Sequence, residues 1–455
     1  MSDPFDPIGR LDPIAAAARL AGRRGRALLH SGRDDDGCGR WSFVACEPIR
    51  TVEARGRRIV VRRHDGALLR EIDGDPLELV AHELKLRDRG PSAHGPQPLA
   101  IGWLGYELGQ ATMAHGGRLS ARRSDAGDPP DLWLGFYGAV ARWAPGAASP
   151  AIVGGDSRAR AALARALADG PHQPGAPPRL GPLLPDDTAD GYRHRVARIL
   201  HYIGAGDVYQ VNLARRLVAR ILADGDPLAL YAALARIAPA PYGGLIEGDS
   251  ATVLSGSPEL FLRRSTDEPR LETRPIKGTR RRTGDAARDR ALAAELVADP
   301  KEQAEHLMIV DLERNDLGRV AELGSVRVDR FGYEVELPQL YHLVSQVSCR
   351  VRAGVGVGDV LRATFPGGSI TGAPKIRAMQ IIDELEPARR GPYTGALGWL
   401  GSGGSMELAI AIRCAVISGG ELRLHVGGGI VADSTPEREL EETEEKAAAW
   451  RASLR

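Results

Sequence analysis

The sequence has few cysteines, few lysines and no long hydrophobic run. Its four cysteines show no CxxC spacing, and none of its eleven histidines has another four residues away, so it carries neither a disulfide framework nor a zinc signature. No apolar stretch approaches the roughly 18 residues of a membrane helix, and the first residues form neither a basic nor an apolar leader. These absences predict a cytoplasmic protein with no membrane anchor.

The sequence also lacks an excess of either charge. Its 60 basic and 59 acidic residues nearly cancel, to a formal net charge of +1. Nucleic acid is therefore disfavoured as the main partner, because proteins that bind it carry a clearly basic domain or stripe. A chain of 455 residues, 43% of them apolar, has the composition of a globular protein with an ample core.

Lysine is the scarcest charged residue. Only five of the 60 basic residues are lysines, namely Lys85, Lys277, Lys301, Lys375 and Lys446. Compositional drift towards arginine explains such scarcity on most surfaces. Arginine cannot, however, replace lysine where the chemistry needs a compact ammonium group that can lose its proton. We therefore treat the five positions as pointers to functional sites.

A stretch rich in proline and glycine at 168–182 sets turns and interrupts regular hydrogen bonding. It predicts a linker at 169–187 between an N-terminal unit, 1–168, and a larger unit, 188–455. Strand-like segments lie at 58–62 and 132–137, and a helix is expected at 157–168. After the linker, helical patterns at 190–203, 226–237, 286–297, 300–317 and 374–385 alternate with strand-like runs at 252–254, 260–263, 326–330, 408–417 and 422–426. This alternation predicts an α+β enzyme with substantial antiparallel sheet.

Two of the expected helices carry paired glutamates. Glu302 and Glu305 lie three residues apart and share one face of a helix that starts at 299–300. Glu439 and Glu442 share a face of the last helix in the same way. A solvated surface explains either helix singly. Two such helices together favour a divalent metal site, because Mg²⁺ takes hard oxygen ligands from one or two carboxylates.

Two glycine-rich segments and one arginine indicate ligand contact. The loop at 365–375 opens a helix but lacks the GK[ST] of a phosphate loop, so it suits either a carboxylate or a plain tight connection. The glycines at 427–429 follow the strand at 422–426 and allow a ligand to approach the backbone, or form a bulge or turn. Arg413 lies in the apolar strand at 408–417, where it needs a carboxylate from a ligand or from the protein.

Six motifs occur in the order in which they occur in the chorismate-utilising enzymes, and the chain resembles that family. The motifs lie at 206–213, 257–259, 275–279, 302–306, 365–375 and 427–446. The resemblance is dense from Asp190 onwards and looser before it. It implies the four-layer α/β/β/α fold of anthranilate synthase, with two packed, largely antiparallel sheets and outer helices.

The resemblance also implies the site. Mg²⁺ is held, directly or through water, by Glu302, Glu305, Glu439 and Glu442, and it binds the ring carboxylate of chorismate. The enolpyruvyl carboxylate meets Tyr393, Arg413, Gly427, Gly428 and Gly429, with Lys446 nearby. Glu259 corresponds to the general acid that protonates the departing C4 hydroxyl. The remaining residues that line the site are Thr279, His342, Ser369 and Gly372.

Two positions then separate the branches of the family. Members that add water to chorismate resemble one another in having a lysine as general base at the position of Gln210. The amide of glutamine has no useful basicity, so we expect an enzyme that adds ammonia instead of water. Anthranilate synthases carry alanine where this chain has Lys277, and the lysine version resembles the aminodeoxychorismate synthases of folate (4-aminobenzoate) biosynthesis. The implied mechanism has Lys277 add covalently to chorismate before ammonia does. Anthranilate synthesis, and a non-catalytic amino-acid-binding regulator, are the alternatives.

The ammonia source is not visible in the sequence. No cysteine lies in a glutaminase-type elbow, and Cys38 in a polar loop is only a weak candidate, so we expect a separate glutamine amidotransferase subunit as partner. The segment at 28–32 resembles the family's amino-acid-binding region. It has His30 where tryptophan-regulated members have glutamate. Tryptophan regulation is therefore not expected, although a structural tryptophan site fits the resemblance.

Overall fold

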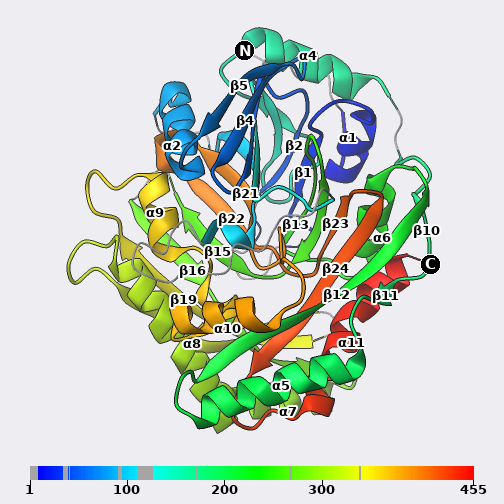
Figure 1. The fold of residues 1–455 in the computed structure, drawn as a ribbon. Helices are drawn as coiled ribbons and strands as arrows, with labels where there is room; N and C mark the ends of the chain where they lie inside the picture. The colour runs from blue at the N-terminus through cyan, green and yellow to red at the C-terminus, as the bar shows by residue number, and fades with distance from the viewer. Residues whose placement is uncertain are drawn as a thin grey trace.

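The computed structural model describes residues 9–33, 39, 41–90, 95–109, 127–170, 173–265, 269–337 and 340–454. In these residues the chain forms two 12-stranded sheets whose strand pairs are antiparallel, packed between outer helices (Figure 1). This arrangement confirms the α+β class and the four layers expected from the resemblance. No described helix has the length and apolarity needed to cross a membrane. Cys38 lies outside the described residues.

The first sheet has the strand order β10-β12-β24-β23-β14-β13-β1-β2-β8-β9, and both β11 and β20 pair with β12. Its strands are β1 (Ala27–His30), β2 (Ser42–Ala45), β8 (Val140–Trp143), β9 (Ala151–Val153), β10 (Arg179–Leu180), β11 (Leu184–Pro185), β12 (Gln210–Ala223), β13 (Tyr242–Glu247), β14 (Thr252–Ser257), β20 (Gly372–Ala373), β23 (Cys414–Ser418) and β24 (Glu421–Ile430). The long pair of β12 and β24 brings the motifs at 206–213 and 427–446 side by side.

The second sheet has the order β17-β19-β16-β15-β22-β21-β6-β7-β3-β4-β5, and β18 pairs with β19. Its strands are β3 (Arg50–Arg55), β4 (Arg58–Arg63), β5 (Leu68–Asp73), β6 (Pro98–Leu104), β7 (Leu132–Phe136), β15 (Leu260–Arg264), β16 (Arg270–Arg274), β17 (Ile276–Arg281), β18 (Arg327–Glu336), β19 (Leu340–Arg350), β21 (Ala396–Gly401) and β22 (Met406–Ile410). Strands from before and after the segment 169–187 lie in both sheets, and the division into two units there stays a prediction.

The helices cover the outer faces of the two sheets, as Figure 1 shows. On the first sheet lie α1 (Pro13–Arg19), α4 (Ser157–Ala168), α5 (Ala189–Gly204), α6 (Pro227–Ile237) and α11 (Pro436–Ser453), while α10 (Lys375–Leu385) packs on β12. On the second lie α2 (Pro76–Arg87), α7 (Ala286–Ala298) and α8 (Pro300–Gly318), and α9 (Val357–Thr364) packs on α2 and α8. Asp299 caps α8 by accepting hydrogen bonds from the N–H groups of Lys301 and Glu302, which confirms the predicted helix start.

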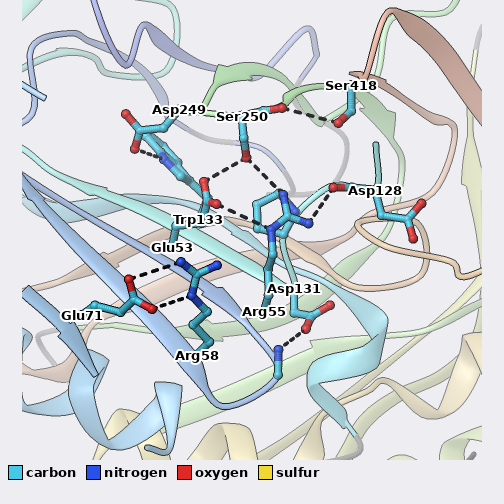
Figure 2. Close-up of polar contacts among 12 residues, drawn as sticks. Glu53, Arg55, Arg58, Glu71, Asp128, Asp131, Trp133, Asp249, Ser250 and Ser418 are labelled. Carbon is cyan, nitrogen blue, oxygen red and sulfur yellow. Dashed lines mark hydrogen bonds and ion pairs between the residues drawn. The ribbon is translucent and has the colours of Figure 1, made fainter. Parts of the chain in front are cut away.

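Aromatic and polar contacts join the two sheets. Trp103 and Trp133 stack at 5.4 Å within an apolar cluster to which both sheets contribute. Figure 2 shows polar contacts at one side of this layer. Ser250, in the turn between β13 and β14, donates to Glu53 of β3 at 2.9 Å, and Trp133 Nε1 donates to Asp249 at 2.9 Å. The sheets are therefore held together by buried side chains as well as by chain crossings.

Two predictions about strands were wrong. The apolar run at 408–417 is not one strand. It is β22 of the second sheet followed by β23 of the first, and Arg413 lies in the crossing between them with a φ of 48°. A continuous apolar run records burial and cannot reveal that the chain changes sheets. The glycines at 427–429 do not follow a strand either, since they lie inside β24 and pair with Asn212 to Ala214 of β12.

Candidate active site

Residues from both sheets meet near Gly429. Gln210 begins β12, Lys277 lies on β17 and Gly429 lies on β24. A Cβ atom built on Gly429 would overlap the Gln210 amide nitrogen and lie 3.5 Å from Lys277 Nζ. The amide oxygen of Gln210 is buried and has no hydrogen-bond partner among the described residues. Glycine at position 429 therefore leaves room beside an amide and an amine that face the same space.

Glu259 is a buried carboxyl group, only 5% exposed, in the same region. Ser369 donates a hydrogen bond to its Oε1 at 2.6 Å. Burial raises the pKa of Glu259 to about 7, although the hydrogen bond from Ser369 and the charge of Lys277 act in the opposite direction. A carboxyl group with this pKa is partly protonated near neutral pH, which suits a general acid.

Lys277 is held in a mixed environment. Burial lowers the pKa of Lys277, while the negative charges of Glu305 and Glu259 act to raise it. The net direction is downward, so the neutral amine is more accessible than in an exposed lysine. A neutral amine is the form that attacks carbon, and a desolvated lysine is a common way to obtain it.

Glu305 of α8 faces Glu439 and Glu442 of α11. A Cβ atom on Gly428 would lie 3.1 Å from Glu442 Oε1 and 3.2 Å from Glu439 Oε2, which places both carboxylates of α11 over β24. Burial raises the pKa of Glu305 and that of Glu439, and the charge of Glu442 adds to both shifts. The like charges are therefore close enough to disfavour one another.

The glutamates already have different partners. Glu302 accepts a hydrogen bond from Arg280 at 2.9 Å, and Glu442 forms an ion pair with Lys446 at 2.5 Å. Glu439 Oε2 is buried and has no hydrogen-bond partner in the described part of the chain. Arg280 was not singled out in the sequence, although its position directly after Thr279 was a signal.

The carboxylates fit a hard divalent cation that completes its shell elsewhere. Within the described residues, no three of the His, Cys, Asp and Glu side chains come close enough together to hold a metal ion as a preformed cage. Magnesium does not need one, since it is bound through one or two carboxylates together with waters and substrate oxygens. The buried Oε2 of Glu439, which has no partner among the described residues, and the nearby carboxylates of Glu305 and Glu442 would be such ligands.

The residues expected around the enolpyruvyl carboxylate lie along β24 and the sheet crossing. Lys446 Nζ donates to the carbonyl oxygen of Gly427 at 2.7 Å. Tyr393 is buried and stacks on His425 of β24 at 5.3 Å. The guanidinium of Arg413 has no ion-pair partner among the described residues, and the acidic group that faces it is Glu259. It is therefore available to a carboxylate ligand.

Thr279 and His342 form a pair on the neighbouring strands β17 and β19, with 3.0 Å between Thr279 Oγ1 and His342 Nδ1. Burial lowers the pKa of His342 to about 3, so the ring is neutral, and its Nε2 has no partner in the described structure. Gly372, unlike Thr279 and His342, contributes through its backbone position. A Cβ there would overlap the carbonyl oxygen of Gln210, so Gly372 packs against the backbone that places Gln210.

A cavity lies at the region expected to bind an amino acid. It measures about 290 Å³ including its mouth, and Leu29, His30, Trp41 and Trp399 are among the residues that line it. Burial lowers the pKa of His30, and its ring lies 3.0 Å from the Tyr231 hydroxyl. A neutral histidine offers no negative charge to an amino group. The absence of tryptophan regulation stays a prediction.

Known proteins are similar to this chain both in sequence and in fold. Residues 27–452 match the family described as chorismate binding enzyme. The chain belongs to this family. It is a chorismate-utilising enzyme, and the site above lies within the matched residues. The chain is 35% identical over 446 residues to aminodeoxychorismate synthase component 1 of Bacillus subtilis, which covers 95% of this chain and 92% of that protein.

Anthranilate synthases are also similar, over different extents. Anthranilate synthase component 1 of Aquifex aeolicus is 46% identical over 262 residues, which cover 58% of this chain and 52% of that protein. The crystal structure of anthranilate synthase component I from Streptococcus pneumoniae superposes with a TM-score of 0.77 at 27% identity and covers 91% of this chain and 92% of that one. Similarity over nearly the whole chain thus extends to an aminodeoxychorismate synthase component and to an anthranilate synthase component.

Proposed function

We propose that this family member aminates chorismate at C4, forming 4-amino-4-deoxychorismate, as component 1 of an aminodeoxychorismate synthase. The observation that supports the proposal most strongly is Lys277 opposite Gln210 across Gly429. The amine can act as a nucleophile, whereas the amide cannot activate water. The similarity to the Bacillus subtilis component 1 over almost the whole length of both chains agrees with it.

The proposed reaction has two steps on the Lys277 side chain. The neutral amine adds to C2 of chorismate, both conjugated ring double bonds shift, and the C4 hydroxyl leaves as water with a proton from Glu259. Ammonia then adds to C4, both double bonds shift back, and Lys277 leaves from C2 as the neutral amine. The enolpyruvyl group is retained. In this proposal Arg413 and Lys446 would hold its carboxylate, since cationic side chains form charge-assisted hydrogen bonds with carboxylates.

The proposal includes a cation and a partner. Mg²⁺ held by Glu439 with Glu305 or Glu442 would neutralise the ring carboxylate and assist loss of the hydroxyl. Ammonia would come from a glutamine amidotransferase subunit in the cytoplasm. Burial raises the pKa of Cys46 to about 12 and that of Cys349 to about 11, so these two thiols are not activated nucleophiles.

Product identification tests the function. The enzyme is incubated with chorismate, Mg²⁺ and an ammonium salt at alkaline pH, and the expected product is 4-amino-4-deoxychorismate. Anthranilate with release of pyruvate would overturn the proposal in favour of the anthranilate branch, to which the local 46% identity draws attention. Mass spectrometry without ammonia tests the covalent step, because the peptide containing Lys277 should gain the mass of chorismate less one water.

A further inference from the structure

The loop at 365–374, between α9 and α10, carries Ser369 to its contact with Glu259. Three ionisable residues lie beneath the loop: Glu313 and Asp316 of α8, each 3% exposed, and Lys375 at the start of α10. None of them meets chorismate in the mechanism above. Burial of charged groups is costly, so their position calls for a separate reason.

Lys375 ties the start of the loop to α8. Its Nζ donates hydrogen bonds to the carbonyl oxygens of Thr364 at 3.0 Å and Pro366 at 2.8 Å, and it forms an ion pair with Asp316. These three acceptors match the three donors of an ammonium group. The first residues of the loop are therefore fixed on α8.

Glu313 holds the next part of the loop. Its Oε1 accepts a hydrogen bond from the N–H of Gly368 at 3.0 Å. Gly368 packs so closely on α8 that a Cβ there would lie 2.6 Å from Leu312 Cδ2. Gly368 is thus held directly by α8, one residue before the serine whose hydroxyl meets Glu259.

We propose that Glu313, Asp316 and Lys375 form a buried clamp that positions Ser369 against Glu259 and thereby tunes the proton donor of the reaction. They are positioning residues, because they act on Glu259 through the loop. The proposal rests on the proposed function, in which Glu259 is the general acid. A hydrogen bond of 2.6 Å tolerates little movement of its donor, so the loop has to be held firmly.

Loss of the clamp should change the pKa of Glu259 in one direction. The ionisable groups that face Glu259 are Lys277 of β17, Arg413 in the sheet crossing and Glu313 of α8. Burial raises the pKa of Glu313 to about 8, so this group is largely neutral near neutral pH. Burial raises the pKa of Glu259, and the hydrogen bond from Ser369 opposes the rise. Loss of that hydrogen bond moves the pKa further up. A general acid works in its protonated form. The fall of kcat at high pH, the alkaline limb of its pH profile, therefore moves to higher pH.

Variants of Glu313 separate positioning from bulk. Glu313→Ala removes the acceptor for the Gly368 N–H, whereas Glu313→Gln keeps an oxygen at the same place. We expect kcat with chorismate and ammonium to fall about 100-fold in the alanine variant, as for other small misplacements of reacting groups, with the alkaline limb moved to higher pH. The glutamine variant should retain most of the activity and the wild-type limb.

Variants of Lys375 test the other half of the clamp. Lys375→Met should give the same loss and the same shift. It leaves Asp316 buried without its partner, so a double variant with Asp316→Leu removes both charges and keeps a folded protein for the measurement. Arg377→Met is the matched control. Arg377 lies on the same helix as Lys375, and its loss breaks an ion pair to Asp207 but leaves the loop contacts in place. Its pH profile should equal that of the wild type.

The decisive comparison uses Ser369→Ala. In that background Lys375→Met should add no further shift of the alkaline limb, because both changes act on one hydrogen bond. Loss of kcat with an unmoved limb, or shifts that add together, would overturn the clamp. A wild-type enzyme that makes no 4-amino-4-deoxychorismate overturns the proposed function instead. The clamp is then tested by the Glu259 pKa itself, measured by carbon-13 NMR with Glu259→Gln to assign the signal.

Discussion

Replacing Gly429 by alanine adds one methyl group where Gln210 and Lys277 meet. The new Cβ would overlap the Gln210 amide nitrogen and lie 3.2 Å from its Cδ and 3.5 Å from Lys277 Nζ. The φ angle of Gly429 is not positive, so the backbone accepts alanine without strain. The clash falls on the end of a flexible side chain, and the amide has to turn away. We expect the fold to survive while the geometry of the site changes.

The expected size follows from the displacement. An overlap of this kind moves the amide by about 1 Å or more, and misplacement of that order beside reacting atoms lowers kcat by about 10- to 100-fold. The assay is steady-state amination of chorismate with an ammonium salt, together with the thermal unfolding midpoint. Gly204→Ala at the end of α5 is the control, since a Cβ there meets nothing within 4 Å. A Gly429→Ala enzyme with wild-type kcat would show that Gln210 and Lys277 do not face the reacting space.

Three further variants test the buried charges. Glu259→Gln should stabilise the protein in urea unfolding, by about 2 kcal/mol more at pH 8 than at pH 5. The reason is that a folded-state pKa raised from 4.5 to about 7 destabilises the fold increasingly as the pH rises between those values. An equal effect at both pH values contradicts the raised pKa. Glu439→Gln should increase the Mg²⁺ concentration needed for half-maximal activity, whereas Glu441→Gln, exposed on the same helix, should not; equal Mg²⁺ dependence argues against a ligand role. Arg390→Met should cost about 3–5 kcal/mol of unfolding free energy, since it leaves the buried Glu386 without the partner that it holds at 2.6 Å, and a cost below about 1 kcal/mol would show that the pair is not a structural one.

The parts of the site that could be predicted from the sequence have local signals. Asp299 and Pro300 mark the start of α8 because capping needs only neighbouring residues, and the spacing of Glu302 and Glu305 then places them on one face. That Gln210 and Lys277 share a site came from the family resemblance. Their strands lie in different sheets, and no periodicity in the sequence relates two sheets to each other.

The residues that were missed depend on contacts between distant segments. Glu313 and Asp316 follow Ile309 and Val310 at helical spacing on the buried face of α8. Two acidic residues in that position were a signal, because carboxylates on a buried face need partners. The partners are Gly368 and Lys375, which the chain reaches only after β18, β19 and α9. The signal could therefore indicate that a partner exists without indicating which one.

The scarcity of lysine now has a physical reason at three of the five positions. In the proposed mechanism Lys277 has to lose its proton, which a guanidinium does not do. Lys375 places a single nitrogen among two carbonyl oxygens and a carboxylate, and Lys446 bridges the Gly427 carbonyl and Glu442. A planar guanidinium suits paired, parallel acceptors better than such compact sets. Lys301 has no such reason, because its ion pair with Asp433 is long, at 3.7 Å, and exposed. Lys301→Arg should therefore leave activity and its pH profile unchanged. Lys375→Arg should reproduce the shifted pH profile of the clamp variants. A Lys375→Arg enzyme with the wild-type profile would mean that charge alone holds the loop.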